Sequence, residues 1–291
     1  MKTKVCFDNS SLGELYKRRG NINLESLSEK FKIYLSTINI LELINYENIV
    51  KRNELLRFYD KIKYKDYPPL DIPEKLLKKT YLAISQRNKY LPASADGNLG
   101  QSLLLYLENP DEIPPTAAQM CKKTFNHINN GIKITSNISR KDSRVKELIK
   151  NRHVSESLPV FLNLLFKSDI ITTTIEKALS SLGINNAKKG YINMLINEPT
   201  PCLFYICAYY GGVYNWGFRR EYSPHPNRND VIQAAYLSIC DYFITDDKAL
   251  KNLLNEVLIF INSYLGIDLK KKILDLDELL RPHSSIIKPN K

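Results

Sequence analysis

The chain has 291 residues, of which 43% are hydrophobic and 25% are charged. This balance is typical of a globular protein and excludes an intrinsically disordered chain, and the length allows one large core or two smaller ones. The formal net charge of +11 favours a polyanionic partner, nucleic acid first and an anionic membrane second, although many basic proteins bind neither.

The first expected strand and helix meet at an aspartate. Residues 4–7 form a β-prone run that ends at Asp8, and a helical pattern covers residues 12–19. Asn9 and Ser10 lie between them. An aspartate in this position lies at the carboxyl end of a strand, where open α/β sheets collect ligands, but it is also a favoured helix N-cap.

A second strand and helix follow. Residues 32–36 predict a strand, and Thr37 or Asn39 is a candidate N-cap for one long helix over residues 40–59. Glu42 lies in the first turns of this helix. Its side chain can face the carboxyl edge of the sheet, although a glutamate near a helix start also complements the helix dipole.

The middle of the chain is helical and has little strand signal. Asp71, Pro73 and Glu74 indicate a helix start of the capping-box type. The expected helices cover residues 75–88, 116–128, 143–153, 157–167, 173–182 and 187–197. We therefore interpret residues 61–198 as a helical insertion.

Residues 199–218 are uncharged and about as long as a membrane span requires. Their glycines and tyrosines make a poor lipid-facing helix, so we expect a buried aromatic-rich helix instead. Tyr209, Tyr210, Tyr214 and Trp216 could stack on nucleic-acid bases, but aromatic residues on a buried helix more often belong to the core.

A stretch near the C-terminus joins two further acidic positions to a helix and a strand. Apolar residues recur at helical spacing behind Asp230, and the apolar run 242–244 then ends at Thr245, Asp246 and Asp247. Carboxylates are thus expected at a helix start and at a strand end, the edges where ligands collect in α/β sheets.

Beyond this stretch, residues 257–261 predict a short strand, residues 270–273 form a basic segment that could lead a second one, and residues 275–280 predict a last helical turn. The five cysteines show no C-x-x-C pair and no regular spacing, which predicts reduced thiols in a cytoplasmic protein. The N-terminal sequence reaches a charged residue too early for the apolar centre of a signal peptide.

Four acids, Asp8, Glu42, Asp230 and Asp247, each follow an expected strand or begin an expected helix. Carboxylates that cluster repel one another unless a divalent cation neutralises them. Oxygen ligands favour Mg²⁺ or Mn²⁺ over zinc, and the sequence shows no His and Cys ligand cluster. The acids therefore predict a Mg²⁺ or Mn²⁺ site.

These segments resemble the acidic motifs of the PIN-domain nucleases. The matching segments, in chain order, are VCFDNSSL at 5–12, STINILEL at 36–43, NDVIQAA at 229–235 and DYFITDDKAL at 241–250. The last motif, an apolar strand followed by Thr, any residue and Asp, is the most specific, and the glutamate motif is the weakest. The long helical middle is not covered by the resemblance.

The resemblance implies an α/β protein with a three-layer PIN-like fold, in which helices flank a mainly parallel sheet. Residues 1–60 and 199–291 would form the nuclease domain and residues 61–198 the insertion. The implied activity is metal-dependent endonuclease cleavage, with RNA as the preferred nucleic-acid partner. An inhibitor protein or a second copy of the chain is a further candidate partner, and no membrane is expected.

On the same resemblance Asp8, Asp230 and Asp247 would hold the metal, with Glu42 contributing directly or through water. Asp246 occupies a variable position of the motif and is a helper at most. The small polar residues beside the acids, Asn9, Ser10 and Thr245, could orient water, phosphate or the carboxylates. Each of these three residues also suits an ordinary helix cap or turn.

Arg219 and Arg220 precede the loop that enters Asp230 and are candidate contacts to a phosphate backbone, whereas other basic clusters are typical of solvated helix faces. His225, between two prolines, is more typical of a loop residue than of a general acid. A phosphatase of the Asp-x-Asp type would need a carboxylate at Ser10, and no glycine-rich phosphate loop is present. The remaining alternative is a catalytically silent PIN-like scaffold that binds RNA or a partner protein.

Overall fold

The computed structural model describes residues 2–64, 67–88, 95, 97–150, 157–218 and 228–281. Within these ranges the side chains of residues 97–98, 129–141, 149, 216–218 and 228–230 lie outside the description.

The chain is an α/β protein that combines many helices with a small parallel sheet. The strands are β1 (Thr3–Phe7), β2 (Phe31–Tyr34), β3 (Tyr242–Ile244) and β4 (Lys272–Leu274). All neighbouring strands run parallel, in the order β2-β1-β3-β4, with Val5 opposite both Ile33 and Tyr242. Each of these four strands is predicted by the sequence to within a few residues.

The direction of the chain across the sheet reverses between β1 and β3. From β1 the chain moves outward to β2, and from β3 it moves outward on the other side to β4. Because the strands are parallel, their carboxyl ends lie at one edge. Open α/β sheets bind ligands outside the carboxyl ends at such a reversal.

The N-terminal helices begin where polar side chains satisfy free backbone N–H groups. Asp8 caps α1 (Asn9–Lys17), which therefore starts three residues earlier than the hydrophobic pattern predicts. After a 3-10 turn, η1 (Arg19–Asn21), Asn23 caps α2 (Leu24–Lys30). The sequence pattern does not predict α2, because Leu27 is its one buried residue, which leaves no amphipathic pattern.

The single long helix expected over residues 40–59 is wrong. The structure has two helices, α3 (Thr37–Ile44) and α4 (Ile49–Ile62). The break occurs because Asn48 caps a new helix by accepting a hydrogen bond from the Lys51 N–H at 3.0 Å. The N-cap of α3 is Ser36, and Asn39 is its partner in a capping box. The expectation that Thr37 or Asn39 caps this helix is therefore wrong.

Helices dominate the middle of the chain, as expected. They are α5 (Pro73–Ser85), α6 (Gly97–Glu108), α7 (Pro115–Lys141), α8 (Ser143–Lys150), α9 (Leu158–Lys167), α10 (Ile170–Ser181) and α11 (Lys189–Asn197), with a 3-10 turn, η2 (Pro110–Glu112), before α7. The helix α6 is not among the expected helices, and α7 is longer than the helix expected over residues 116–128. The expected capping box is also wrong, because Asp71 accepts a hydrogen bond from Lys79 at 2.7 Å and caps no helix.

The aromatic segment forms the buried helix α12 (Pro201–Phe218), and Tyr209, Tyr210 and Tyr214 lie in the core, which confirms the structural interpretation of these three residues. The side chain of Trp216 lies outside the described residues. Two short helices follow, α13 (Arg228–Gln233) and the 3-10 helix η3 (Ala234–Ser238).

The strand expected over residues 257–261 is wrong, because these residues lie inside α14 (Lys248–Tyr264). The apolar run continues the helical spacing set by Leu250, Leu253 and Leu254, so that one face of α14 is buried throughout. The last element is α15 (Leu276–Leu280), where the sequence predicts a helical turn.

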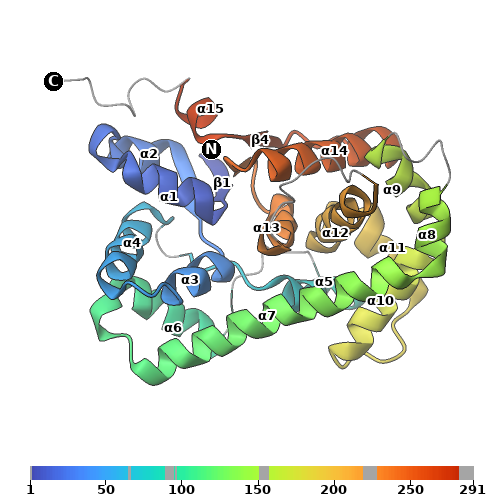
Figure 1. The fold of residues 1–291 in the computed structure, drawn as a ribbon, viewed down its shortest axis with the longest axis horizontal. Helices are drawn as coiled ribbons and strands as arrows, with labels where there is room; N and C mark the ends of the chain where they lie inside the picture. The colour runs from blue at the N-terminus through green and yellow to red at the C-terminus, as the bar shows by residue number, and fades with distance from the viewer. Residues whose placement is uncertain are drawn as a thin grey trace.

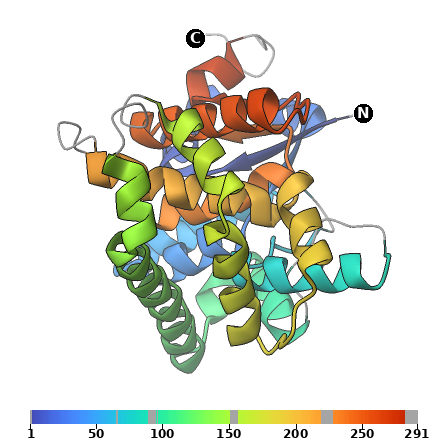
Figure 2. The same ribbon diagram turned by 90° about the vertical axis from the view of Figure 1, so that its right-hand side faces the viewer.

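The sheet and α14 occupy one half of the molecule, and the helices from the middle of the chain fill the other half (Figures 1 and 2). One hydrophobic cluster runs through both halves, from Val5 in β1 to Leu280 in α15. The helix α12 joins the halves, since it contacts α5, α9 and α11 from the middle of the chain and η3 and α14 from its C-terminal part. Residues 61–198 therefore share their core with the two ends of the chain.

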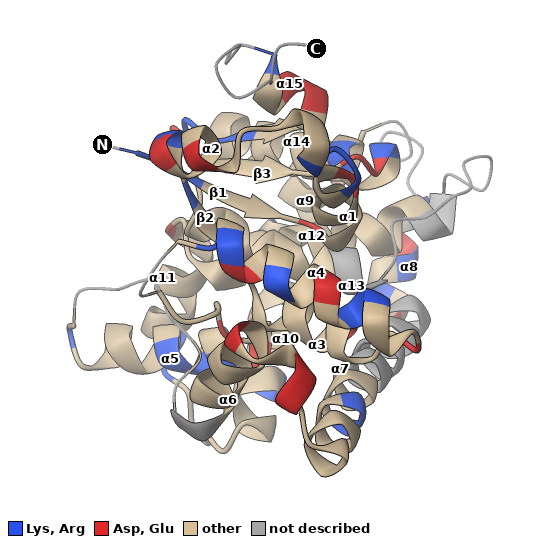
Figure 3. Ribbon diagram, turned by 90° about the vertical axis from the view of Figure 1, so that its left-hand side faces the viewer, with Lys and Arg blue, Asp and Glu red and all other residues tan. Residues whose placement is uncertain are grey.

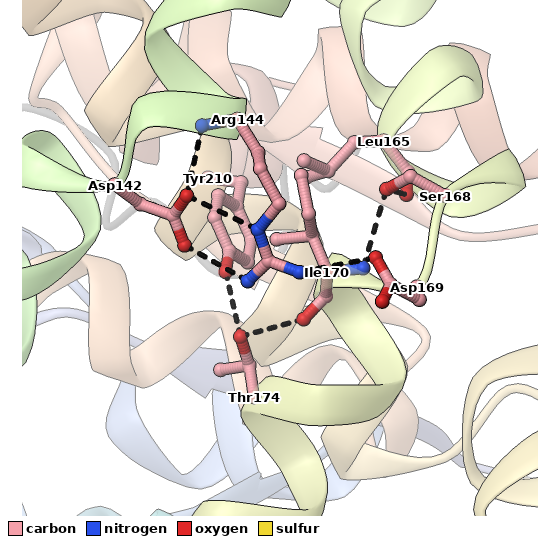
Figure 4. Close-up of polar contacts among 8 residues, drawn as sticks. All are labelled: Asp142, Arg144, Leu165, Ser168, Asp169, Ile170, Thr174 and Tyr210. Carbon is pink, nitrogen blue, oxygen red and sulfur yellow. Dashed lines mark hydrogen bonds and ion pairs between the residues drawn. The ribbon is translucent and has the colours of Figure 1, made fainter.

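A polar cluster links α8, α10 and α12 (Figure 4). The guanidinium of Arg144 bonds both carboxylate oxygens of Asp142 and reaches Asp169 at 3.1 Å. Below it, the hydroxyls of Thr174 and Tyr210 are 2.8 Å apart. The cluster ties α8 to α10 and α12, but its ion pairs are exposed to solvent and contribute little to stability.

All five cysteines are free thiols, and all are buried. In the described part of the chain no single helix is long and apolar enough to cross a membrane. The bent pair α9 and α10 passes that test of length and composition together, at an angle of 72°.

Candidate functional site

Two of the sequence-predicted acids, Asp8 and Asp247, lie at the reversal between β1 and β3. Asp8 directly follows β1, and Thr245, Asp246 and Asp247 directly follow β3. The Asp8 N–H donates to the carbonyl of Ile244 at 3.0 Å, which holds the two strand ends together. The fold thus places residues more than two hundred positions apart at one edge of the sheet.

Asp8 is a buried carboxylate surrounded by donors. Its Oδ1 accepts a 2.7 Å bond from the Ser11 N–H, its Oδ2 accepts a 2.6 Å bond from the Thr245 hydroxyl, and the Ser10 hydroxyl lies 2.9 Å from both oxygens. Only 1% of Asp8 is exposed. Burial raises the pKa of Asp8, and these hydrogen bonds offset only part of that rise.

Glu42 is tied to the same site through an amide side chain. The Nδ2 group of Asn9 donates to Oε2 of Glu42. The pKa of Glu42 is raised, first by burial and also by the negative charge of Asp8, while the Asn9 bond counteracts the rise. Both carboxyl groups therefore favour the protonated form more than an exposed carboxyl does.

A chain of amides connects Glu42 to α13. The Nδ2 group of Asn39 donates to Oδ1 of Asn9 at 2.8 Å and lies 3.5 Å from Oε1 of Gln233. Asn39 is itself fixed by the capping box, since its Oδ1 accepts bonds from both the backbone and the hydroxyl of Ser36. Gln233 is 1% exposed, and its Nε2 has no partner among the described residues.

Asp247 and Asp246 have different roles in the structure. Asp247 caps α14, because its Oδ1 accepts bonds from the N–H groups of Ala249 and Leu250 at 2.7 and 3.0 Å. Asp246 is exposed and joins the sheet edge to its neighbours, through its N–H to the Ser11 hydroxyl and its Oδ1 to the Leu276 N–H. Asp246 therefore orders a loop.

The remaining predicted site residues lie partly outside the description. Asp230 lies in α13, but its side chain is not described. Positions 230 and 233 are three residues apart on this helix and share a face, and Gln233 is the residue that reaches the amide chain. Arg219, Arg220 and His225 lie outside the described residues altogether.

The supporting residues Asn9, Ser10 and Thr245 all bond the predicted acids, and Thr245 joins two of them. Besides its bond to Asp8, the Thr245 hydroxyl accepts the Asp247 N–H at 3.2 Å. Among the side chains that the structure describes, no three acidic, histidine or cysteine residues converge closely enough to hold a metal ion.

Sequence reasoning missed several residues of the site: Ser11, Asn39, Gln233 and Tyr59. Burial raises the pKa of the Tyr59 hydroxyl on α4, and the charges of Glu42 and Asp8 raise it further. One of these residues carried a sequence signal, because Ser36 and Asn39 have the spacing of a capping box. The others are brought to the site by tertiary packing.

Charged residues on the described surface are spread over several elements. In Figure 3, lysines and arginines alternate with acids along α4, and further basic segments lie on α5 and α8. The excess positive charge is therefore distributed over this face and is not restricted to the acidic site.

Comparison with protein families, with curated proteins and with solved structures finds no match to this chain.

Proposed function

We propose that the protein is a metal-dependent endonuclease, with RNA as its preferred substrate and a three-layer PIN-like arrangement of its two ends. The observation that carries the proposal is the pair of carboxyl groups at the reversal of the sheet, the buried Asp8 and the half-buried Glu42, which accepts a hydrogen bond from Asn9, the residue next to Asp8 in the chain. Asp247 follows the neighbouring strand. Paired buried acids at a ligand-binding edge are a frequent mark of a functional site.

The donor chemistry at this edge suits a divalent cation, with Asp230 needed beside the described acids, which do not by themselves converge closely enough to hold one. Asp8, Glu42 and Asp247 offer the oxygen ligands that Mg²⁺ and Mn²⁺ prefer. Glu42 Oε1 and Asp247 Oδ2 accept no hydrogen bond from the described residues, so each retains ligand capacity. Because burial raises the pKa of Asp8 and Glu42, an adjacent positive charge would restore their ionised forms.

Each residue then has a defined task. Asp8, Asp230 and Asp247 would hold the ion, with Glu42 acting directly or through water. A bound ion supplies charge stabilisation at the phosphate and lowers the pKa of a water molecule. Ser10 and Thr245 fix the Asp8 carboxylate, and no nucleophilic side chain is required.

The charge of the whole chain supports a nucleic-acid substrate. A net charge of +11 attracts a polyanion and speeds its association. The candidate phosphate contacts Arg219 and Arg220 belong to the same proposal. The five free, buried thiols agree with a reducing, cytoplasmic environment.

A second candidate is the silent PIN-like scaffold that binds RNA or a partner protein. The observation that favours it is the use of Asp8 and Asp247 as helix N-caps, a purely structural task that both residues perform. A scaffold would retain these aspartates for their caps alone.

Cleavage assays with matched variants separate the two candidates. The purified chain is incubated with Mg²⁺ or Mn²⁺ and with RNA, single-stranded DNA or duplex DNA. We expect Asp247→Asn to lower cleavage about 100-fold or more while the thermal midpoint stays nearly unchanged, because asparagine is as good an N-cap as aspartate. Asp8→Asn should also abolish cleavage. The matched control is Asp268→Asn, which removes an exposed carboxylate elsewhere.

The enzyme proposal fails if no nucleic acid is cleaved with either ion and neither ion raises the thermal midpoint. In that case RNA binding without cleavage would identify the scaffold. Full activity of Asp247→Asn would show that Asp247 is not part of the catalytic site.

A further inference from the structure

A pocket of about 280 Å³ lies between α1, α2 and α4, away from the acidic site. Its lining residues are Tyr16, Arg19, Leu24, Glu54, Arg57, Phe58 and Lys61. Tyr16 lies eight residues after Asp8 on α1, roughly 12 Å along the helix axis at 1.5 Å per residue. The pocket is therefore separate from the carboxylates.

The base of the pocket is apolar and aromatic. The rings of Tyr16 and Phe58 meet edge to face with centroids 5.4 Å apart, and each residue is 4% exposed. The partly buried side chain of Leu24 adds an aliphatic wall. Such a surface excludes water and favours a flat apolar group.

The rim of the pocket is positively charged. Arg19, Arg57 and Lys61 are all exposed, and Glu54 is the one acid in the lining. Residues 54, 57, 58 and 61 recur at helical spacing, so one face of α4 supplies both the rim and part of the base. The lining thus has three cations against one anion.

Contacts within the lining hold its charged groups in place. The guanidinium of Arg19 lies 3.8 Å from the centre of the Tyr16 ring and donates to the Tyr16 carbonyl at 3.0 Å. The Tyr16 hydroxyl donates to Glu54 at 2.6 Å, which lowers the pKa of that carboxyl and keeps it ionised. A guanidinium held in this way loses little entropy when it binds an anion.

Two of the cations remain available to a ligand. Arg57 forms an ion pair with Asp111, whereas Arg19 and Lys61 have no carboxylate within ion-pair distance among the described residues. An arginine carries five N–H donors, and Arg19 uses one of them for a carbonyl. The pocket therefore combines free cationic donors with an apolar base.

We propose that this pocket binds one nucleotide, with its base against Leu24 and Phe58 and its phosphate at Arg19 and Lys61. The volume is near the lower end of the roughly 300–1,000 Å³ typical of small-molecule sites, which suits a single nucleotide unit. That unit is either a free mononucleotide or one residue of an RNA strand. The proposal does not depend on cleavage at the acidic site.

Calorimetric titration of the full chain in EDTA tests this assignment without any metal. The probes are the four ribonucleoside 5′-monophosphates, a four-residue RNA, adenosine and inorganic phosphate. We expect a monophosphate or the RNA to bind more tightly than adenosine or phosphate alone. Binding of the monophosphate but not of the RNA identifies a free nucleotide as the ligand, and the reverse result identifies an RNA subsite.

Three variants assign the binding to the pocket. Arg19→Ala and Lys61→Ala should each weaken binding about tenfold, because each removes charge-assisted hydrogen bonds to the phosphate. Leu24→Ala should weaken nucleotide binding but not phosphate binding. The control Lys177→Ala removes the same charge from an exposed position on α10 and should leave binding unchanged. Thermal melting confirms that each variant folds.

The proposal is overturned if neither the monophosphates nor the RNA bind, if the pocket variants bind as tightly as the control, or if inorganic phosphate binds as tightly as the nucleotides. Asp8→Asn separates this result from the nuclease proposal, because it should retain full binding in EDTA. Nucleotide binding without any cleavage activity would support the pocket and reject the nuclease.

Discussion

Asp8 and Glu42 are costly residues for the metal-free fold. Burial disfavours their charged forms, and the charge of Asp8 also disfavours ionisation of Glu42. The hydroxyls of Ser10 and Thr245 and the amide of Asn9 recover part of this cost by hydrogen bonding. Carboxyl groups that remain buried at a cost in folding free energy are typical of a functional site.

Glu42→Gln tests this cost through its pH dependence. The pKa of Glu42 is raised in the folded state. The free energy that Glu42 contributes to stability is therefore fully present below the unfolded pKa of about 4.5, and it is lost as the pH rises through the folded pKa. Without metal, Glu42→Gln should therefore raise the thermal midpoint at pH 8 and change it little at pH 4. Melting curves in EDTA across this range measure the difference.

Magnesium provides the second half of this test. The ion should raise the thermal midpoint of the wild-type protein at neutral pH, and it should raise that of Glu42→Gln much less, because the variant lacks one anionic oxygen ligand. A midpoint difference between the two proteins that does not change with pH would contradict the cost assigned to Glu42.

Helix N-caps determine where the helices begin and how the acidic side chains are positioned. Ser36 and Asn39 form a capping box that starts α3, and the same Asn39 side chain holds Asn9 against Glu42. The cap thus couples the start of a helix to the position of a carboxylate two turns further along. The break between α3 and α4 is also made by a cap, at Asn48.

Ser36→Ala should lower the free energy of unfolding by about 0.5–2 kcal/mol, the usual effect of losing an N-cap. It should also lower cleavage, because Asn39 loses the hydroxyl that fixes it. The matched control is Asn23→Ala, which removes the N-cap of α2 and has no bond to the acids. Denaturant unfolding and cleavage rates, measured together, test both effects.

Equal cleavage by these two variants at equal stability would show that the capping box has no influence on Glu42. A loss of cleavage in Ser36→Ala alone supports the coupling.

At the scale of the whole molecule, the two ends of the chain and its helical middle share one hydrophobic cluster. The helix α12 is buried between them, and the Tyr236 hydroxyl in η3 donates to the carbonyl of Asp71 at 3.1 Å. The sheet alone is small, with strands of three to five residues. Such a sheet needs the helices for its stability.

Removal of residues 61–198, with a short linker in their place, should therefore give a chain without cooperative unfolding. The deletion exposes the faces of α3 and α12 that the inserted helices cover, and an exposed apolar surface of this kind promotes aggregation. Circular dichroism during thermal melting measures the loss of the transition. A cooperative transition close to that of the full chain would show that the two ends fold independently.

The sequence by itself determined the positions of the four strands, the aspartates that follow β1 and β3, and most of the helices, because hydrophobic periodicity and capping are local signals. Local signals did not separate α3 from α4 or distinguish the buried face of α14 from a strand. Only the tertiary structure decided which strands are neighbours, that Asp8 meets Thr245, and that Asn39 and Gln233 join the site. These contacts connect residues up to 237 positions apart, and such pairing depends on how the whole core packs.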